Sequence, residues 1–164
     1  MKIIKEISSY VIIIILVVLV RTFIITPVRV EGVSMNSTLN NGDLLFLKKY
    51  DKSYDRFDVV VFKYNDKRLI KRVIGLPGEH VKYVNDKLYI NGKHVVDKYG
   101  KGMTLDFDIK KINYDKIPEG YYFVMGDNRQ NSTDSRVIGL VSSKDIAGVT
   151  DFRFFPFTKI GTFN

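Results

Sequence analysis

Three short stretches of this sequence combine hydroxyl, amine and carboxylate side chains in patterns that could support hydrolysis. In the first, residues 32–39 (GVSMNSTL), Ser34 lies between an apolar segment and a polar turn. A serine hydroxyl can act as a nucleophile when a neighbouring base removes its proton. The same residue could instead be a turn-capping hydroxyl, and this stretch alone leaves both interpretations open.

The second stretch, residues 69–78 (LIKRVIGLPG), places a lysine among aliphatic side chains. Alternate residues of an extended strand share a face, so Lys71 shares one with Leu69 and Val73. Burial of an ammonium group among aliphatic side chains disfavours its charge and lowers its pKa, which makes a lysine a usable base near neutral pH. The alternative is a lysine whose stem packs while its amine reaches water.

The third stretch, residues 126–136 (GDNRQNSTDSR), contains no apolar side chain. It could be a polar hairpin loop stabilised by turns between side chains and backbone. Its carboxylates, hydroxyls and arginines would also suit a hydrogen-bonded network that holds an active site rigid. In such a network Asp134 can pair with Arg136, and Ser132 can orient a neighbouring group.

The composition narrows the chemistry that these stretches can support. The chain has 164 residues, of which 45% are hydrophobic and 27% charged, as in a globular protein. It has no cysteine, which excludes disulfides, thiol nucleophiles and cysteine-based metal centres. The two histidines, His80 and His94, lie outside the three stretches, and we find no metal-ligand spacing and no sign of a cofactor. A hydrolytic site built from the three stretches must therefore use a lysine or a carboxylate as its base.

The net charge of +8 raises nucleic acid or an anionic membrane surface as possible partners. The basic residues are interleaved with acidic ones, and neither a basic tail nor an RNA-binding or helix-turn-helix pattern is present. The charge therefore does not favour nucleic-acid binding.

The N-terminal segment has the pattern of a membrane anchor. Residues 7–25 carry one charge, Arg21, and a helix of this length reaches roughly 28 Å, enough to cross the hydrocarbon core once. A cleavable signal peptide is the alternative, but residues 21–30 (RTFIITPVRV) are bulky and contain no small-residue processing site. Basic residues on both flanks leave the orientation of the anchor open.

The residues after the anchor predict a mainly β fold. Apolar alternation recurs about every 8 to 12 positions, and Asn85-Asp86 and Asn91-Gly92 predict two hairpin loops in a three-stranded meander over residues 80–96. Residues 97–116 lose this alternation. We therefore expect a core formed by residues 26–82 and 117–164, with a small inserted β-subdomain at residues 83–116. The predicted strands are residues 28–33, 43–48, 58–64, 69–74, 80–84, 87–90, 93–96, 120–125, 137–141 and 147–155.

Taken together, the three stretches resemble the motifs of the bacterial type I signal peptidases. In chain order they read Ser-Met-x-x-Thr-Leu from Ser34, Lys-Arg-Val-Ile-Gly-Leu-Pro-Gly from Lys71, and Gly-Asp-Asn-x-x-x-Ser-x-Asp-Ser-Arg from Gly126. A further motif, Arg-Phe-Asp-Val-Val-Val-Phe, begins at Arg56. The resemblance extends from residue 7 to about residue 150, which is nearly the whole chain.

The resemblance implies a role for each reactive residue. Ser34 would be the nucleophile, Lys71 the general base and Ser132 the hydroxyl that orients the lysine amine. A charged shell would support this site, formed by Asp127, Asp134 and Arg136.

The chain departs from the family pattern at three positions. Ser37 stands where proline is usual and Phe57 where glycine is usual, and neither change removes a reacting group. Some members carry a hydroxyl residue two positions before the nucleophile, which helps to form the oxyanion hole, whereas this chain has Gly32 there. We therefore expect the backbone around Gly32 and Ser34, chiefly the N–H of Ser34, to hold the oxyanion.

The resemblance also implies fold, function and location. The fold would be an antiparallel β catalytic domain with a small inserted β-subdomain, preceded by one transmembrane helix. The protein would be a membrane-bound serine endopeptidase, without cofactor or metal, that removes signal peptides from exported preproteins with small residues at the first and third positions before the cut. Residues 1–6 would lie in the cytoplasm and the catalytic domain outside the cell membrane. An apolar groove for the peptide would be lined by Val28, Val30, Met35, Leu39, Val61 and Ile70.

Two other functions fit the same scaffold. A catalytically silent, membrane-anchored β-module could assist surface-protein assembly, but the presence of both Ser34 and Lys71 argues against it. A regulatory Ser/Lys autoprotease should cut its own chain, and no small-residue cleavage site precedes the core.

Overall fold

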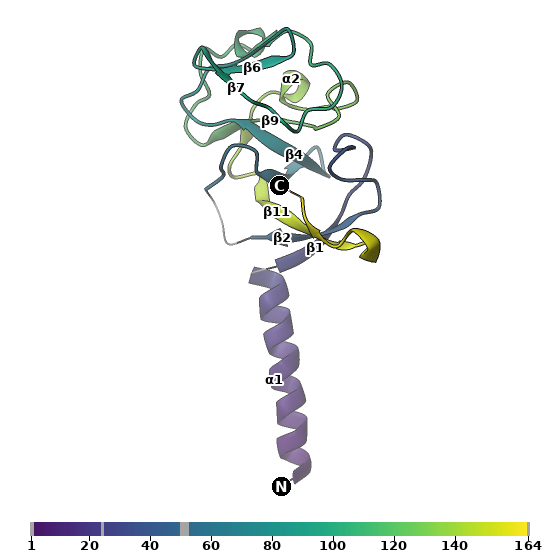
Figure 1. The fold of residues 1–164 in the computed structure, drawn as a ribbon. Coiled ribbons are helices and arrows are strands. Elements are labelled where there is room, and N and C mark those ends of the chain that lie inside the picture. Colours follow the sequence, from purple (N-terminus) through teal and green to yellow (C-terminus); the bar gives the residue numbers. More distant parts are fainter. Residues whose placement is uncertain (1, 24, 50–52, 164) are drawn as a thin grey trace.

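The computed structural model describes residues 2–23, 25–49 and 53–163, which form one long helix and a β-rich body. Figure 1 shows helix α1 (Lys2–Phe23) projecting from the end of the body where β1 and β2 lie, with β6 and β7 at the far end. Aliphatic side chains of α1 are exposed; Ile12, for example, is 64% exposed. The expected N-terminal helix is therefore present.

The stronger expectation, that residues 7–25 cross a membrane, is not confirmed and stays a prediction. Among the helices in the described part of the chain, none reaches the combination of length and apolar character that a membrane span requires. Residue 24, inside the expected anchor, lies outside the described residues.

The body contains a large antiparallel sheet, which confirms the mainly antiparallel β prediction. Its strand order is β1-β2-β11-β3-β4-β9-β10, with β12 paired to β11. The edge position of β1 leaves one side of it open to another extended chain. The strands are β1 (Ile25–Arg29), β2 (Leu44–Lys48), β3 (Val59–Tyr64), β4 (Lys67–Gly75), β9 (Tyr121–Met125), β10 (Val141–Ser142), β11 (Ile146–Phe155) and β12 (Gly161–Thr162).

A second, smaller sheet has the order β7-β6-β5-β8. The predicted meander is present, and positive φ angles at Asn85, Asp86, Asn91 and Gly92 form its two hairpin loops. The sequence did not reveal β8 or the 3-10 helix that follows it. The division into a core and an inserted subdomain stays a prediction. The elements here are β5 (Val81–Val84), β6 (Lys87–Ile90), β7 (Lys93–Val95), β8 (Phe107–Asp108) and η1 (Ile109–Ile112).

Strand β4 lies where three apolar clusters meet. Ile74 packs with Phe123 and residues of the small sheet, Val73 packs with Val124, and Ile70 packs with Met35 and other residues near β1. A polar side chain on β4 between these residues therefore leaves water when the protein folds.

Two predicted strands are wrong in part. Residues 137–141 do not continue as a strand, because Asp134 caps a short helix, α2 (Ser135–Ile138), by accepting a hydrogen bond from the backbone N–H of Arg136. Only Val141–Ser142 then pair with β9. The strand expected at residues 28–33 ends at Arg29, and the chain turns through a hydrogen bond from Asn36 N to Val33 O. A last 3-10 helix, η2 (Phe157–Lys159), precedes β12.

Candidate active site

Ser34 lies in the turn that follows β1. The turn closes through backbone bonds to Met35 O from Thr38 N (3.1 Å) and Leu39 N (2.9 Å), and the buried side chains of Met35 and Leu39 fix it to the core. Ser34 itself is only partly buried. Its hydroxyl is thus held by a rigid turn and remains accessible.

Lys71, on β4, reaches this hydroxyl from inside the protein. Its side chain is 2% exposed, and its Nζ lies 2.8 Å from Ser34 Oγ and 3.1 Å from Ile70 O. Of the two interpretations open for Lys71, the structure supports the buried amine. Desolvation by burial lowers the pKa of Lys71 to about 8, although the charges of Asp134 and Asp127 act in the opposite direction. The amine is therefore partly neutral near pH 7 and can accept the serine proton.

An arginine is paired with each of these two buried carboxylates. Arg72 donates from Nε and Nη2 to the two oxygens of Asp127, at 2.9 and 2.7 Å. Arg136 donates in the same way to Asp134, at 2.8 Å for both bonds, so the pair predicted from the sequence is present. Each bidentate pair offsets a negative charge that would otherwise favour protonated Lys71.

Ser132 lies beside the site, and its hydroxyl is not hydrogen-bonded to Lys71 in the described part of the chain. Its Oγ is buried and has no hydrogen-bond partner in the described part of the chain, so the bond to the lysine amine that the resemblance implies is not formed here. Gly126 separates it from the nucleophile: a Cβ at Gly126 would lie 2.3 Å from Ser132 Oγ and 2.4 Å from Ser34 O. Only glycine fits between these two residues. This spacing role of Gly126 could not be predicted from the sequence.

The expected oxyanion donors differ in their surroundings. The N–H of Gly32 donates to Asn41 Oδ1 at 2.9 Å, so this amide is already engaged. Gly32 has a φ of 89°, a conformation that favours glycine and allows the chain to turn toward Ser34. The N–H of Ser34 remains the candidate for binding the oxyanion.

The six residues expected to line a groove do lie together, but as core. All belong to one apolar cluster, and even the most exposed of them, Ile70 and Val28, are only 7% and 6% exposed. Their side chains pack against one another, so they form a closely packed floor and not the walls of a deep pocket. The remaining four are Val30, Met35, Leu39 and Val61.

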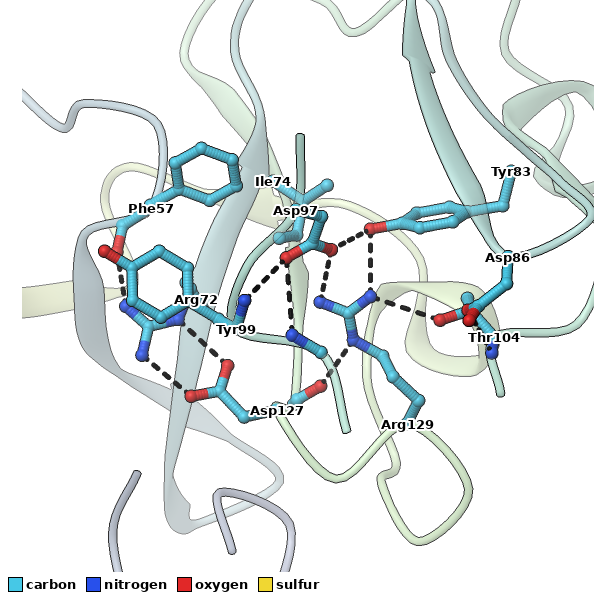
Figure 2. Close-up of polar contacts among 12 residues, drawn as sticks. Phe57, Arg72, Ile74, Tyr83, Asp86, Asp97, Tyr99, Thr104, Asp127 and Arg129 are labelled. Atoms are coloured by element: carbon cyan, nitrogen blue, oxygen red, sulfur yellow. Dashed lines mark hydrogen bonds and ion pairs between the residues drawn. The ribbon is translucent and has the colours of Figure 1, made fainter. Parts of the chain in front are cut away.

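Sequence reasoning also missed the role of Arg129, which joins the small sheet to the loop after β9 (Figure 2). This 3% exposed arginine donates to Gly126 O (3.1 Å), Tyr83 Oη (3.1 Å) and Thr104 Oγ1 (3.2 Å), and it forms an ion pair with Asp97. Burial raises the pKa of Tyr83, so its hydroxyl stays neutral and donates to Asp97. The arginine lies within the third motif, but no local pattern identified its partners.

His94 belongs to β7 of the small sheet, and His80 directly precedes β5 of the same sheet. His80 Nδ1 lies 2.7 Å from Asp115 O, and His94 packs against Tyr89. In the part of the chain that the structure describes, neither histidine forms a hydrogen bond or ion pair with Ser34 or Lys71, which agrees with a structural role for both.

Known proteins are similar to this chain over most of its length. The family model described as "Signal peptidase, peptidase S26" matches residues 3–155. The chain is similar to signal peptidase I of Bacillus licheniformis, with 41% identity over 94% of this chain and 89% of that protein. It is also similar to signal peptidase I of Streptococcus pneumoniae R6, with 38% identity over 97% of this chain and 96% of that protein. The crystal structure of a signal peptidase I from Enterococcus faecalis V583 aligns with a TM-score of 0.56 at 39% identity, covering 59% of this chain and 96% of that one.

Proposed function

Since the chain belongs to the signal peptidase family, peptidase S26, and is a serine-protease hydrolase that removes signal peptides, we propose that Ser34 and Lys71 form its catalytic dyad. The observation that carries this proposal is the 2.8 Å separation of Lys71 Nζ and Ser34 Oγ at a site where burial lowers the lysine pKa to about 8. Geometry and basicity together suit the transfer of a proton from the hydroxyl to the amine.

In the acylation half of the proposed reaction, neutral Lys71 takes the proton of the Ser34 hydroxyl as Oγ attacks the scissile carbonyl carbon. The carbonyl oxygen becomes an oxyanion, which accepts a hydrogen bond from the backbone N–H of Ser34. When the tetrahedral intermediate collapses, the C–N bond breaks and the Lys71 ammonium gives its proton to the departing nitrogen. The signal peptide then remains as an ester on Ser34.

Deacylation uses the same two groups. Neutral Lys71 removes a proton from a water molecule, and the resulting hydroxide attacks the ester carbon. Collapse of the second intermediate breaks the bond to Oγ, which recovers its proton from Lys71. Asp127, Asp134 and Arg136 support these steps by fixing the loop beside the amine, and Ser132, in the same loop, orients the amine during the reaction.

We further propose that the signal peptide binds as an added strand along the open edge of β1. The edge position of β1 supports this, because unpaired backbone groups can bond to an extended peptide. The packed floor beneath, with Val28 and Ile70 barely exposed, offers little room for a large side chain of the peptide. Such a floor favours substrates with small side chains at the first and third positions before the cut.

We also propose that α1 attaches the enzyme to the cell membrane, with residues 1–6 in the cytoplasm and the β-rich body outside. The exposed aliphatic side chains of α1 support attachment, because surface of this kind is unfavourable in water. Attachment would hold the enzyme near preproteins tethered in the same membrane and raise their effective concentration. In this proposal residues 26–82 and 117–164 form the catalytic core and residues 83–116 the insertion.

The full chain in detergent, incubated with a purified preprotein, tests the dyad. Ser34→Ala and Lys71→Met should each lose cleavage while circular dichroism shows an unchanged fold, because each removes one partner of the proton transfer. Lys63→Ala is the matched control, since this exposed lysine pairs with Asp66 at the surface. Cleavage by Lys71→Met at the wild-type rate would exclude the lysine as base. A silent scaffold would leave the preprotein intact with every variant, including the wild type.

A further inference from the structure

A cavity of about 440 Å³ opens between the loop before β8 and the loop after β9. Met103, Leu105 and Val137 lie on its rim, while Ser132 and Arg136 belong to its wall. Its size falls in the range of ordinary ligand sites, which is roughly 300–1,000 Å³. None of the six residues expected to line a groove for the signal peptide contributes to it.

The rim is unusually apolar for a surface. Met103, Leu105 and Val137 are 58%, 70% and 74% exposed, although side chains of these types are usually buried. Their grouping around one opening creates an apolar patch that a bound side chain could cover.

The wall of the cavity is held firmly. Arg129 contributes to the wall, and its bonds to Gly126 O, Tyr83 and Asp97 join the two loops that form the opening (Figure 2). A site fixed in this way does not need to be ordered when a ligand binds, which favours affinity.

Ser132 connects the cavity to the reaction centre. It lies in the cavity wall. Its Oγ and the backbone oxygen of Ser34 both lie close to Gly126, where the lack of a side chain leaves room for them. The departing nitrogen must lie close to Lys71 to receive its proton. Lys71 faces the loop that contains Ser132, because the charges of Asp134 and Asp127 in this loop act on its amine. This arrangement places the leaving part of the substrate on the side of Ser34 where that loop and the cavity lie.

We propose that this cavity binds the segment of the preprotein that follows the scissile bond and that it selects for an apolar side chain within the first few residues of that segment. The inference rests on the proposed function. It assigns the floor near β1 to the signal peptide and the cavity to the leaving polypeptide.

The test uses three peptides that share one signal-peptide sequence before the cut and differ after it. One ends in a small chromogenic amide, one continues with glycine and serine, and one carries leucine at the second or third position. For the wild-type full chain in detergent, kcat/KM should be about tenfold higher for the leucine peptide than for the glycine-serine peptide, because filling an apolar pocket has effects of this order.

Charged substitutions on the rim then localise the effect. In Leu105→Asp and in Val137→Asp, the ratio of kcat/KM for the leucine peptide to kcat/KM for the glycine-serine peptide should fall toward one. Val96→Asp should keep the wild-type ratio. Val96 lies in the same segment between β7 and β8 as Leu105 and is 71% exposed, but it does not line the cavity.

The outcomes separate the two proposals. Cleavage of the chromogenic peptide by the wild type without any leucine preference would support the dyad and overturn the cavity proposal. A preference that survives in both rim variants would also overturn it. Failure of the wild type to cleave any of the three peptides would overturn the proposed function, and the cavity proposal with it.

Discussion

The pH dependence of cleavage is the sharpest consequence of the buried amine. Only neutral Lys71 can accept the serine proton, so kcat/KM should follow the neutral fraction of this group. With a pKa of about 8, roughly one tenth of the amine is neutral at pH 7 and nine tenths at pH 9. The rate should therefore rise about tenfold between pH 7 and pH 9 and then level off.

A lysine that kept the ordinary pKa of 10.5 would behave differently. Its neutral fraction would increase about a hundredfold over the same range and would still be rising at pH 9. Initial rates at low substrate concentration, measured from pH 6 to 11 with a peptide that does not titrate there, report the free enzyme. A rate that climbs tenfold per pH unit beyond pH 9, or a profile without any inflection, would show that the amine is not the desolvated base described above.

Three substitutions test contacts at the site and in the small sheet beside it. For Lys71→Met, the free energy of unfolding of the wild type relative to the variant should rise by about 3 kcal/mol between pH 7 and pH 11, as measured by urea denaturation. The reason is that the pKa of Lys71 is lower in the folded state, so at intermediate pH the unfolded state binds a proton that the folded state has released. Gly126→Ala should lower kcat about a hundredfold and destabilise the fold by about 1–3 kcal/mol, because its Cβ would overlap Ser132 Oγ and the Ser34 carbonyl oxygen. An unchanged kcat in this variant would refute the close approach of Ser132 to Ser34. Tyr83→Phe should cost about 1–3 kcal/mol in urea denaturation by removing a donor to buried Asp97, whereas Tyr89→Phe, on the same sheet, should change stability little.

The pairing of Ser34 with Lys71 could be predicted because each of the two residues lies in a contiguous motif. Ser34 follows a strand and opens a turn, and the neighbours of Lys71 on β4 are apolar enough to indicate burial. The local pattern also gave both hairpin loops of the small sheet, since Asn and Gly adopt positive φ at low cost.

Contacts between distant segments could not be predicted in the same way. Arg129 pairs with Asp97 from an irregular stretch that carries no periodicity, and no local signal specifies that pairing. The strand expected at residues 137–141 failed because capping by Asp134 outweighed the β-propensity of Val137 and Ile138. For the groove residues, the sequence indicated apolar character but not whether their surfaces would face a ligand or one another.

The charge balance around Lys71 gives a final test that unites these observations. Asp134 is fully buried and raises the pKa of Lys71, while Arg136 offsets its charge through two bonds. In Arg136→Gln the carboxylate loses this partner but keeps its bond from Gly126 N, so the inflection of the pH profile should move above 8. Each half unit of that shift would lower kcat/KM at pH 7 by roughly threefold. Arg56→Gln, which breaks a separate ion pair with Glu79, is the control and should leave the inflection in place. If both variants titrate like the wild type, the arginine does not regulate the basicity of the lysine.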